Sequence, residues 1–477
     1  MRKTVKKLFS VLFIPITLLL ACAKAEYNPP DLGGIYTQSA MRSHEVGNPV
    51  ILIPGILGSK LRDGETGQLV WGAFDGGTAD PETPEGARLI AIPMKEGVPI
   101  DELTDSVRSD GALDRVKVKL FGLPLQLNAY INILSTLGAG GYLDQSLASN
   151  KLNEIDYGKD HFTCFQFDYD WRLDNVENAK RLKKFIEEKR AYIIGEYKKR
   201  GIRREDVKFD IVAHSMGGLL TRYFLLYGDN DLPGDGSMPE VTWEGAKYVE
   251  KVIIVGTPNA GAIGAVETLV KGRDIGPFLP KYEPAIIGTM PSLYQQLPRT
   301  RHGEVVDENG NRLDLTDPEV WIKLGWGLAD PGQDRVLEWL LPDVSDPAKR
   351  REIALDHLKK SLKRGKEFED AIDTPAAPPP GLKLYLIAGD AILTGAGIKV
   401  DTATGKYEVS QYSPGDGTVT RSSALMDERV GSYWTPKLLS PIKWSNVTFL
   451  FTDHLGLTKS PAFSDNVLFI LLEEPAS

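Results

Sequence analysis

Cysteine is almost absent from this sequence of 477 residues, which has only Cys22 and Cys164. So small a number excludes a disulfide-built scaffold and a cysteine-rich metal site. Cys164 stands among the aromatic residues of the segment 162–167, so we expect it to be a buried strand residue. A chain of this length exceeds the ~250–300 residues of a single core. The length therefore predicts one main domain with a sizeable insertion.

Positive charge is also in deficit. The chain has 56 lysines and arginines against 65 aspartates and glutamates, and its formal net charge is −9. The lysines and arginines form no basic stripe along the sequence. The composition therefore excludes nucleic acid as a partner.

A hydrophobic run of transmembrane length is missing as well. The N-terminal run 8–21 is shorter than the ~20 residues with which a helix crosses a bilayer. It follows four cations, as in a secretory signal peptide: Arg2, Lys3, Lys6 and Lys7. It ends in Leu19-Leu20-Ala21-Cys22, which matches the cleavage box of bacterial lipoproteins.

This box predicts a signal peptide over 1–21, lipidation of the Cys22 thiol and a tether over 22–47. Several acyl chains on one residue make a stable anchor, so a membrane is an expected partner. Ala23, rather than an aspartate, follows the cysteine. By resemblance to sorted lipoproteins, this residue favours the outer membrane of a bacterial cell envelope.

The pentapeptide Ala213-His214-Ser215-Met216-Gly217 is the most informative motif that the chain contains. An apolar run over 207–212 predicts a buried strand before it, and the run 219–227 predicts an amphipathic helix after it. A serine on such a sharp turn needs small residues two positions to either side, and Ala213 and Gly217 provide them. The motif predicts the nucleophile elbow of an α/β-hydrolase, with Ser215 as the nucleophile.

A second glycine-containing strand end supports this interpretation. The segment 48–59 is a short apolar strand that ends in Pro54-Gly55. In α/β-hydrolases, the loop after an early strand supplies one donor of the oxyanion hole, and the residue after the nucleophile supplies the other. We therefore expect the backbone N–H groups of Ile56 and Met216 to be the oxyanion donors.

The rest of the chain alternates between apolar strands and helices. Strands are predicted over 162–169, 249–256, 382–388 and 446–451, and helices near 128–134 and over 176–199. This alternation predicts an α/β-hydrolase fold, with a mostly parallel central sheet and helices on both faces. The run 261–371 has helical patterns and no convincing strand, which indicates a helical cap inserted over the active site. The expected parts are a core over 48–260, the cap over 261–375 and a second core part over 376–477.

The catalytic base should follow the nucleophile in the chain, after the acid. His302 and His357 fall in the predicted cap, whereas His454 directly follows the last strand, so His454 is the expected base. His214 points opposite to Ser215 on the strand and is expected to pack beneath the elbow. There are two candidates for the catalytic acid. Asp390 directly follows a predicted strand, and Asp416 occupies a Gly-Asp-Gly turn that could hold a carboxylate against the imidazole. Their positions alone do not separate them.

Several motifs together resemble the lecithin:cholesterol acyltransferase family and its phospholipase relatives. They are Pro49 to Ser59, Tyr169-Asp170-Trp171-Arg172-Leu173, Ala213 to Gly218, Gly256-Thr257-Pro258-Asn259-Ala260-Gly261 and Gly415-Asp416-Gly417-Thr418-Val419. Their order matches the family from about Asn48 to the C-terminus. The resemblance implies that Asp416 is the acid and that Asp390 is a structural carboxylate. Ile56 departs from the family, which often has an aspartate there.

The resemblance also bears on the substrate pocket. Asp170 and Arg172 are expected to pair and brace its rim, and Trp171 to form a wall of the acyl pocket. Trp71 falls where the family has a mobile lid that contacts lipid. A tryptophan packed on the domain surface is the alternative for this position.

These inferences together predict an enzyme that acts on lipid acyl esters through an acyl-enzyme. Such an enzyme is a hydrolase of the lipase or phospholipase A type, or an O-acyltransferase. No metal or organic cofactor is implied. Two alternatives remain open, a catalytically silent envelope lipoprotein that binds lipid and an esterase of a non-lipid ester.

Overall fold

The computed structural model describes residues 28–74, 77–113, 115–120, 123–128, 130–148, 160–275, 280–430 and 434–474. The predicted signal peptide and Cys22 lie outside these residues. Within them, no helix combines the length and the apolar character that crossing a membrane requires.

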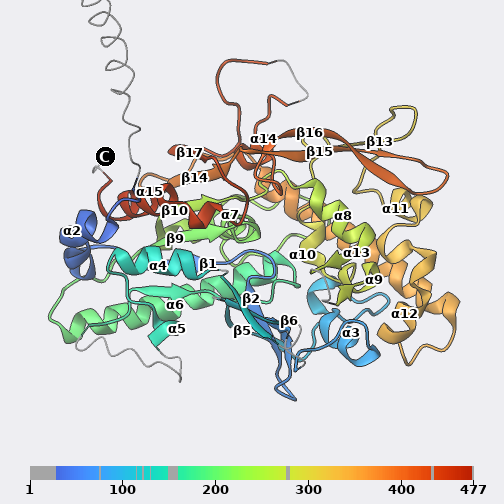
Figure 1. Cartoon of the computed structure of the whole chain (residues 1–477), viewed down its shortest axis with the longest axis horizontal. Coiled ribbons are helices and arrows are strands. Elements are labelled where there is room, and N and C mark those ends of the chain that lie inside the picture. Colours follow the sequence, from blue (N-terminus) through green and yellow to red (C-terminus); the bar gives the residue numbers. More distant parts are fainter. Residues whose placement is uncertain are drawn as a thin grey trace, which may run out of the picture.

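A parallel sheet of six strands forms the centre of the molecule (Figure 1). Every neighbouring pair in it is parallel, which requires a crossover between each strand and the next. In spatial order the strands are β17 (Asn446–Leu450), β14 (Lys383–Gly389), β10 (Val249–Val255), β9 (Phe209–His214), β1 (Val50–Ile53) and β8 (Cys164–Gln166).

The strands of this sheet are apolar on both sides, and helices therefore cover both of its faces. Ile51 and Ile53 pack into one core with α6 (Asn175–Lys199) and α7 (Met216–Tyr227). Val50 and Leu52 point to the other face and pack against α4 (Ile131–Ala139) and α15 (Pro461–Leu472). The period of two along a strand produces this division. The predicted α/β-hydrolase fold is confirmed, and Cys164 is buried in β8 as expected.

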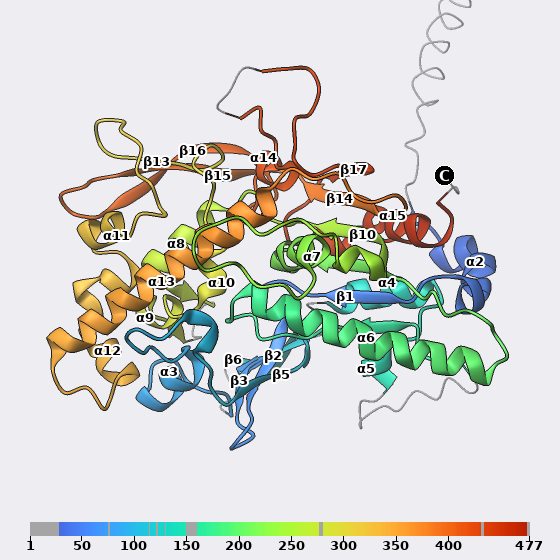
Figure 2. The same ribbon diagram turned by 180° about the vertical axis from the view of Figure 1, so that it is seen from behind.

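Smaller sheets and helices surround the centre. The remaining strands outside the cap are β2 (Ser59–Asp63), β3 (Leu69–Trp71), β4 (Ala73–Phe74), β5 (Val107–Ala112), β6 (Arg115–Leu120), β7 (Leu123–Asn128), β15 (Ile392–Val400) and β16 (Tyr407–Gly415). Besides α2 (Leu32–Val46), the other α-helices outside the cap in the described residues are α3 (Pro84–Ile90), α5 (Gln145–Ala148) and α14 (Arg421–Leu425). Short 3₁₀ helices outside the cap are Ile100–Glu102, Gly245–Tyr248 and Leu457–Lys459. The hairpin of β15 and β16 extends away from the central sheet (Figure 2). β15 begins at Ile392, shortly after β14 ends at Gly389.

The region expected to be a helical cap, 261–375, is mostly helical. It contains α8 (Ile263–Lys271), α9 (Pro284–Ile287), α10 (Pro291–Tyr294), α11 (Pro318–Leu324), α12 (Asp334–Leu340) and α13 (Pro347–Asp373). The expectation that it has no strand is wrong, since it also contains β11 (Arg273–Asp274), β12 (Lys281–Tyr282) and β13 (Glu304–Val306). These strands are too short for an apolar alternation to reveal them. β13 pairs with β15, so the cap shares a sheet with the second core part.

The tether predicted over 22–47 is corrected in its second half. Residues Leu32–Val46 form helix α2, which packs on α15. Tyr36 is only 2% exposed, and its hydroxyl donates a hydrogen bond to Asp465 Oδ1 at 2.7 Å. This tertiary contact outweighs the low helix propensity of Gly33 and Gly34 at the start of the helix.

Candidate active site

The turn between β9 and α7 places Ser215 at the N-terminus of a buried helix. Ser215 has φ 54° and ψ −128°, which is strained backbone for a residue with a side chain. Its N–H donates to Val255 O at 2.8 Å, and its carbonyl accepts from Thr257 Oγ1 at 2.7 Å. A Cβ on Gly217 would lie 2.5 Å from Pro54 O, so only glycine fits there. The elbow thus forms at the predicted residues.

His454 and Asp416 complete a hydrogen-bonded row with Ser215. His454 Nε2 lies 3.2 Å from Ser215 Oγ, and His454 Nδ1 lies 2.8 Å from Asp416 Oδ2. The other oxygen, Asp416 Oδ1, accepts hydrogen bonds from the N–H groups of Thr418 and Val419 at 2.9 and 2.7 Å. The Gly-Asp-Gly turn therefore fixes the carboxylate and leaves one oxygen for the imidazole.

The second acid candidate has a different partner. The carboxylate of Asp390 forms an ion pair with Arg421, whose guanidinium lies over the ring of Phe449 at 3.5 Å. The structure therefore brings Asp416, and not Asp390, to His454. Spacing could not separate the two positions, because both lie at the carboxyl end of β14. Asp390 directly follows β14, and Asp416 lies beside Gly389, the last residue of that strand.

The loop from Pro54 to Gly58 lies directly against the elbow. A Cβ on Gly55 would lie 2.7 Å from Ser215 Cβ and 3.3 Å from Ser215 Oγ. Ile56 follows at once, so the structure brings this expected oxyanion donor beside the nucleophile. Met216 is the first residue of α7, where an N–H has no partner within the helix. Tyr130, which no sequence motif indicated, contacts this loop through its hydroxyl.

The three other histidines that the sequence analysis considered have structural partners. His302 Nε2 and His357 Nε2 lie 3.1 and 2.9 Å from backbone carbonyls, those of Asp427 and Thr289. His214 is buried beneath the elbow as expected, with its ring centroid 5.0 Å from that of His454. Burial, and then the neighbouring His454, lower the pKa of His214 to about 3. It is therefore neutral at physiological pH.

The Tyr-Asp-Trp-Arg motif forms a buried ion network. Arg172 Nη2 lies 2.7 Å from Asp170 Oδ2, and Arg172 Nη1 lies 2.9 Å from Asp105 Oδ2. Arg172 also donates to the carbonyls of Leu89 and Ile90 at the end of α3. The Asp170–Arg172 pair thus joins the segment after β8 to the end of α3, in agreement with a bracing role.

Neither tryptophan that was assigned to the substrate pocket faces an open space here. Trp171 is 2% exposed and donates from Nε1 to Ser59 O at 3.1 Å. Trp71 is 5% exposed and donates to Leu57 O at 2.8 Å. Their rings pack edge to face at 5.6 Å. In this structure Trp71 is therefore packed on the domain, and its side chain braces the loop that carries Ile56.

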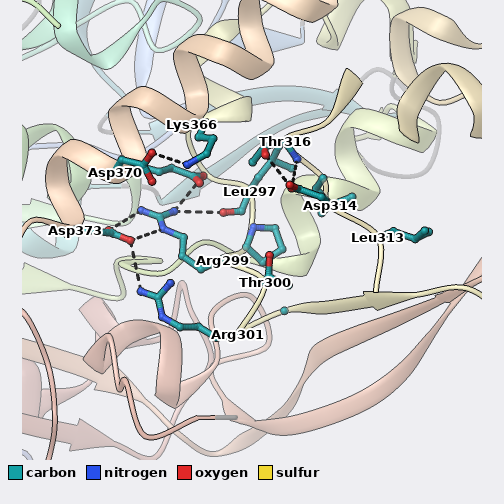
Figure 3. Close-up of a pocket in the computed structure, with 14 residues that line it drawn as sticks. Leu297, Arg299, Thr300, Arg301, Leu313, Asp314, Thr316, Lys366, Asp370 and Asp373 are labelled. Carbon is teal, nitrogen blue, oxygen red and sulfur yellow. Dashed lines mark hydrogen bonds and ion pairs between the residues drawn. The ribbon is translucent and has the colours of Figure 1, made fainter. Parts of the chain in front are cut away.

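A polar cavity of about 240 Å³ lies elsewhere, between α13 and the segment 297–316 (Figure 3). Its cationic side chains Arg299, Arg301 and Lys366 each form an ion pair with a carboxylate. Arg299 donates to both oxygens of Asp373 at 2.9 Å, and Lys366 forms an ion pair with Asp370. Neither Ser215 nor His454 lines it. It is separate from the candidate active site.

One group of acids lies close enough together to be considered for metal binding within the described residues. It comprises Asp101, Glu177 and Asp231, whose oxygens lie within 4.8 Å of one another. Lys180 forms ion pairs with Glu177 and Asp231. Two of the three acids thus already have a cationic partner, and the group includes no residue of the Ser215 site.

Residues 134–308 match the family model described as lecithin:cholesterol acyltransferase. This segment includes the elbow, the Tyr-Asp-Trp-Arg motif and the Gly-Thr-Pro motif. The chain is an α/β-hydrolase similar to lecithin:cholesterol acyltransferase. The family resemblance seen in the sequence is thereby confirmed. No curated protein matches the chain.

Among solved structures, this acyltransferase-like chain is similar to one in the Tle4-Tli4 complex. The TM-score is 0.51 and the identity 16%, over 90% of this chain and 100% of that chain. This likeness supports the hydrolase fold. Two further matches are phospholipase PlaB from Legionella pneumophila (13% identity, TM-score 0.31, 70% of this chain and 55% of that chain) and EstA from Clostridium botulinum (12%, 0.32, 92% and 91%).

The two acid candidates can be separated by mutation. In an acyltransferase-like hydrolase, Asp416→Asn should lower the kcat for a p-nitrophenyl ester by about 10⁴-fold, because an amide holds the wrong histidine tautomer. Asp390→Asn removes only a partly exposed ion pair with Arg421 and should leave kcat nearly unchanged. Steady-state kinetics of both purified variants measures the difference. A larger loss at Asp390 than at Asp416 would overturn the assignment.

Proposed function

We propose that this protein is a serine hydrolase or O-acyltransferase of lipid acyl esters, with Ser215, His454 and Asp416 as its catalytic triad. The observation that carries the proposal is the hydrogen-bonded row from Ser215 Oγ through His454 to Asp416 Oδ2, at a strained elbow. The family match supports lipid esters as the substrate class.

The proposed reaction follows from this geometry. Ser215 Oγ attacks the ester carbonyl while His454 Nε2 takes the serine proton. Asp416 Oδ2 accepts from His454 Nδ1 and stabilises the imidazolium. The N–H groups of Ile56 and Met216 bind the oxyanion. His454 then returns the proton to the departing alkoxide, which leaves an acyl group on Ser215. Water resolves this acyl-enzyme in a hydrolase, and an alcohol resolves it in a transferase.

An apolar rim beside the triad further supports a lipid substrate. Four large apolar side chains next to Asp416 and His454 are strongly exposed: Ile392 (39%), Leu393 (71%), Phe451 (91%) and Leu455 (63%). Two contacts bring their segments together: Ile392 forms a bridge with Asp416, and His454 N–H donates to Asp416 O at 2.9 Å. Leu455 follows His454 in the chain. Exposed apolar patches of this kind mark interaction sites.

A substrate panel tests the proposed reaction. The purified protein should release fatty acid from phospholipid vesicles or a triacylglycerol emulsion, and Ser215→Ala should lower this rate by several orders of magnitude while the fold is kept. Ser361→Ala is the matched control, because Ser361 lies on α13 and its buried Oγ has no hydrogen-bond partner among the residues that the structure describes. Turnover of short soluble esters alone would indicate a non-lipid esterase. Undiminished turnover in Ser215→Ala would refute the site.

We also propose that the enzyme is anchored in a bacterial envelope, with the outer membrane favoured, through acyl chains on Cys22. This residue lies outside the described part of the chain, so the lipoprotein cleavage box is the support. Cys22 stands only ten residues before the start of α2, which packs on the hydrolase domain. An acylated Cys22 would thus hold the domain close to the membrane.

Labelling cells with radioactive palmitate tests the anchor. The unchanged protein and Cys164→Ala should incorporate label, whereas Cys22→Ala should not, because only the residue at the cleavage box is acylated. Cys164 is a suitable control since it is the other cysteine and is buried in β8. Label in Cys22→Ala, or none in the unchanged protein, would contradict the proposal.

A further inference from the structure

We propose that Tyr130 is a positioning residue for the oxyanion donor Ile56, and that His214 fixes the direction of the Tyr130 hydroxyl. This inference rests on the proposed function and deepens it. It assigns a role to two buried polar side chains that take no direct part in the reaction described above.

Three aromatic side chains hold the peptide groups of the loop from Pro54 to Gly58. The Tyr169 hydroxyl donates to Pro54 O at 2.8 Å, and Trp71 Nε1 donates to Leu57 O at 2.8 Å. The Gly55 N–H in turn donates to the Tyr130 hydroxyl oxygen at 2.7 Å. The N–H of Ile56 has no acceptor within the described residues. These three hydrogen bonds fix the loop, and the N–H of Ile56 is left available for an oxyanion.

Tyr130 contacts the nucleophile's own turn directly, because its hydroxyl lies 3.1 Å from His214 Nδ1. The Gly55 backbone whose N–H it holds would, with a Cβ, lie 2.7 Å from Ser215 Cβ. On the other side, a Cβ on Gly58 would lie 2.8 Å from Tyr130 Cε2. The Tyr130 ring thus contacts the loop at both of its glycines. A shift of this ring would move the Gly55–Ile56 peptide relative to Ser215.

His214 determines which way the Tyr130 proton points. The Tyr130 hydroxyl oxygen lies 3.1 Å from His214 Nδ1. Because that oxygen already accepts from Gly55 N–H, its own proton is free to be donated to Nδ1. Neutral His214 then carries its proton on Nε2. Burial lowers the pKa of this imidazole, and hydrogen bonding to the backbone of His454 raises it.

The chain of bonds therefore runs in one direction, from Gly55 N–H to Tyr130 and from Tyr130 to His214. His214 is adjacent to Ser215, and Gly55 is adjacent to Ile56. The two backbone segments that carry the nucleophile and the oxyanion donor are thus joined by one side-chain bridge. Burial raises the pKa of Tyr130, so the phenol stays protonated and the bridge keeps its direction.

Tyr130→Phe tests the bridge, because it removes the hydroxyl and keeps the ring. The kcat for a p-nitrophenyl ester should fall by about 10- to 100-fold, less than the loss of an oxyanion donor itself, while KM stays unchanged. The pH dependence of kcat should keep its position, since His454 retains its partners. Tyr294→Phe is the matched control, because its hydroxyl is also buried and donates to a backbone carbonyl, Gly288 O at 2.9 Å. It should lose similar thermal stability and keep its kcat.

A double-mutant cycle tests the part of His214. The effect of His214→Asn on kcat should be smaller in the Tyr130→Phe background than in the unchanged protein, since both residues act through one bridge. Independent effects would overturn the role of His214. A kcat of Tyr130→Phe within twofold of the unchanged protein would overturn the proposal as a whole. Retained turnover in Ser215→Ala would instead refute the proposed function, so the two failures are distinguishable.

Discussion

The strained turn at Ser215 is the constraint on which the rest of the site depends. A residue with a side chain keeps φ 54° only when its surroundings hold it there. Here the neighbouring strand supplies the acceptor Val255 O, and the Gly-Thr-Pro segment supplies the Thr257 hydroxyl. Packing offsets the free-energy cost of this strain, since every residue of α7 is buried. As a result, the Ser215 hydroxyl projects from the N-terminus of α7 toward His454.

The parallel order of the strands explains why distant residues meet at this turn. The carboxyl ends of β9, β14 and β17 lie at one edge of the sheet, so the segments that follow them converge. His454 follows β17, and Asp416 lies beside Gly389 at the end of β14, where a Cβ on that glycine would be 2.7 Å from Asp416 Cβ. The apolar rim stands on the same segments. The proposed triad and the exposed apolar rim therefore lie at one edge of the fold.

Much of this arrangement could be predicted from the sequence, because the signals are local. The six central strands are apolar runs, and the elbow around Ser215 is a short motif with a fixed context. Asp416 and Asp390 could not be separated by position, since what distinguishes them is their contacts in space, those of Asp416 with His454 and of Asp390 with Arg421. Helix α2 was missed because Tyr36 stabilises it from Asp465, 429 residues away. Tyr130 was missed for the same reason, since it meets Gly55 across 75 residues.

The central claim is that an acyl group is carried on Ser215, and the most direct measurement is to find it there. The protein would be mixed with a long-chain p-nitrophenyl ester, quenched with acid during turnover and digested for mass spectrometry. Acylation of such an activated ester is fast, so the acyl-enzyme accumulates. The account predicts the added mass of the acyl group on the peptide that contains Ser215. An unmodified peptide during active turnover, or an acyl group on another residue, would contradict it.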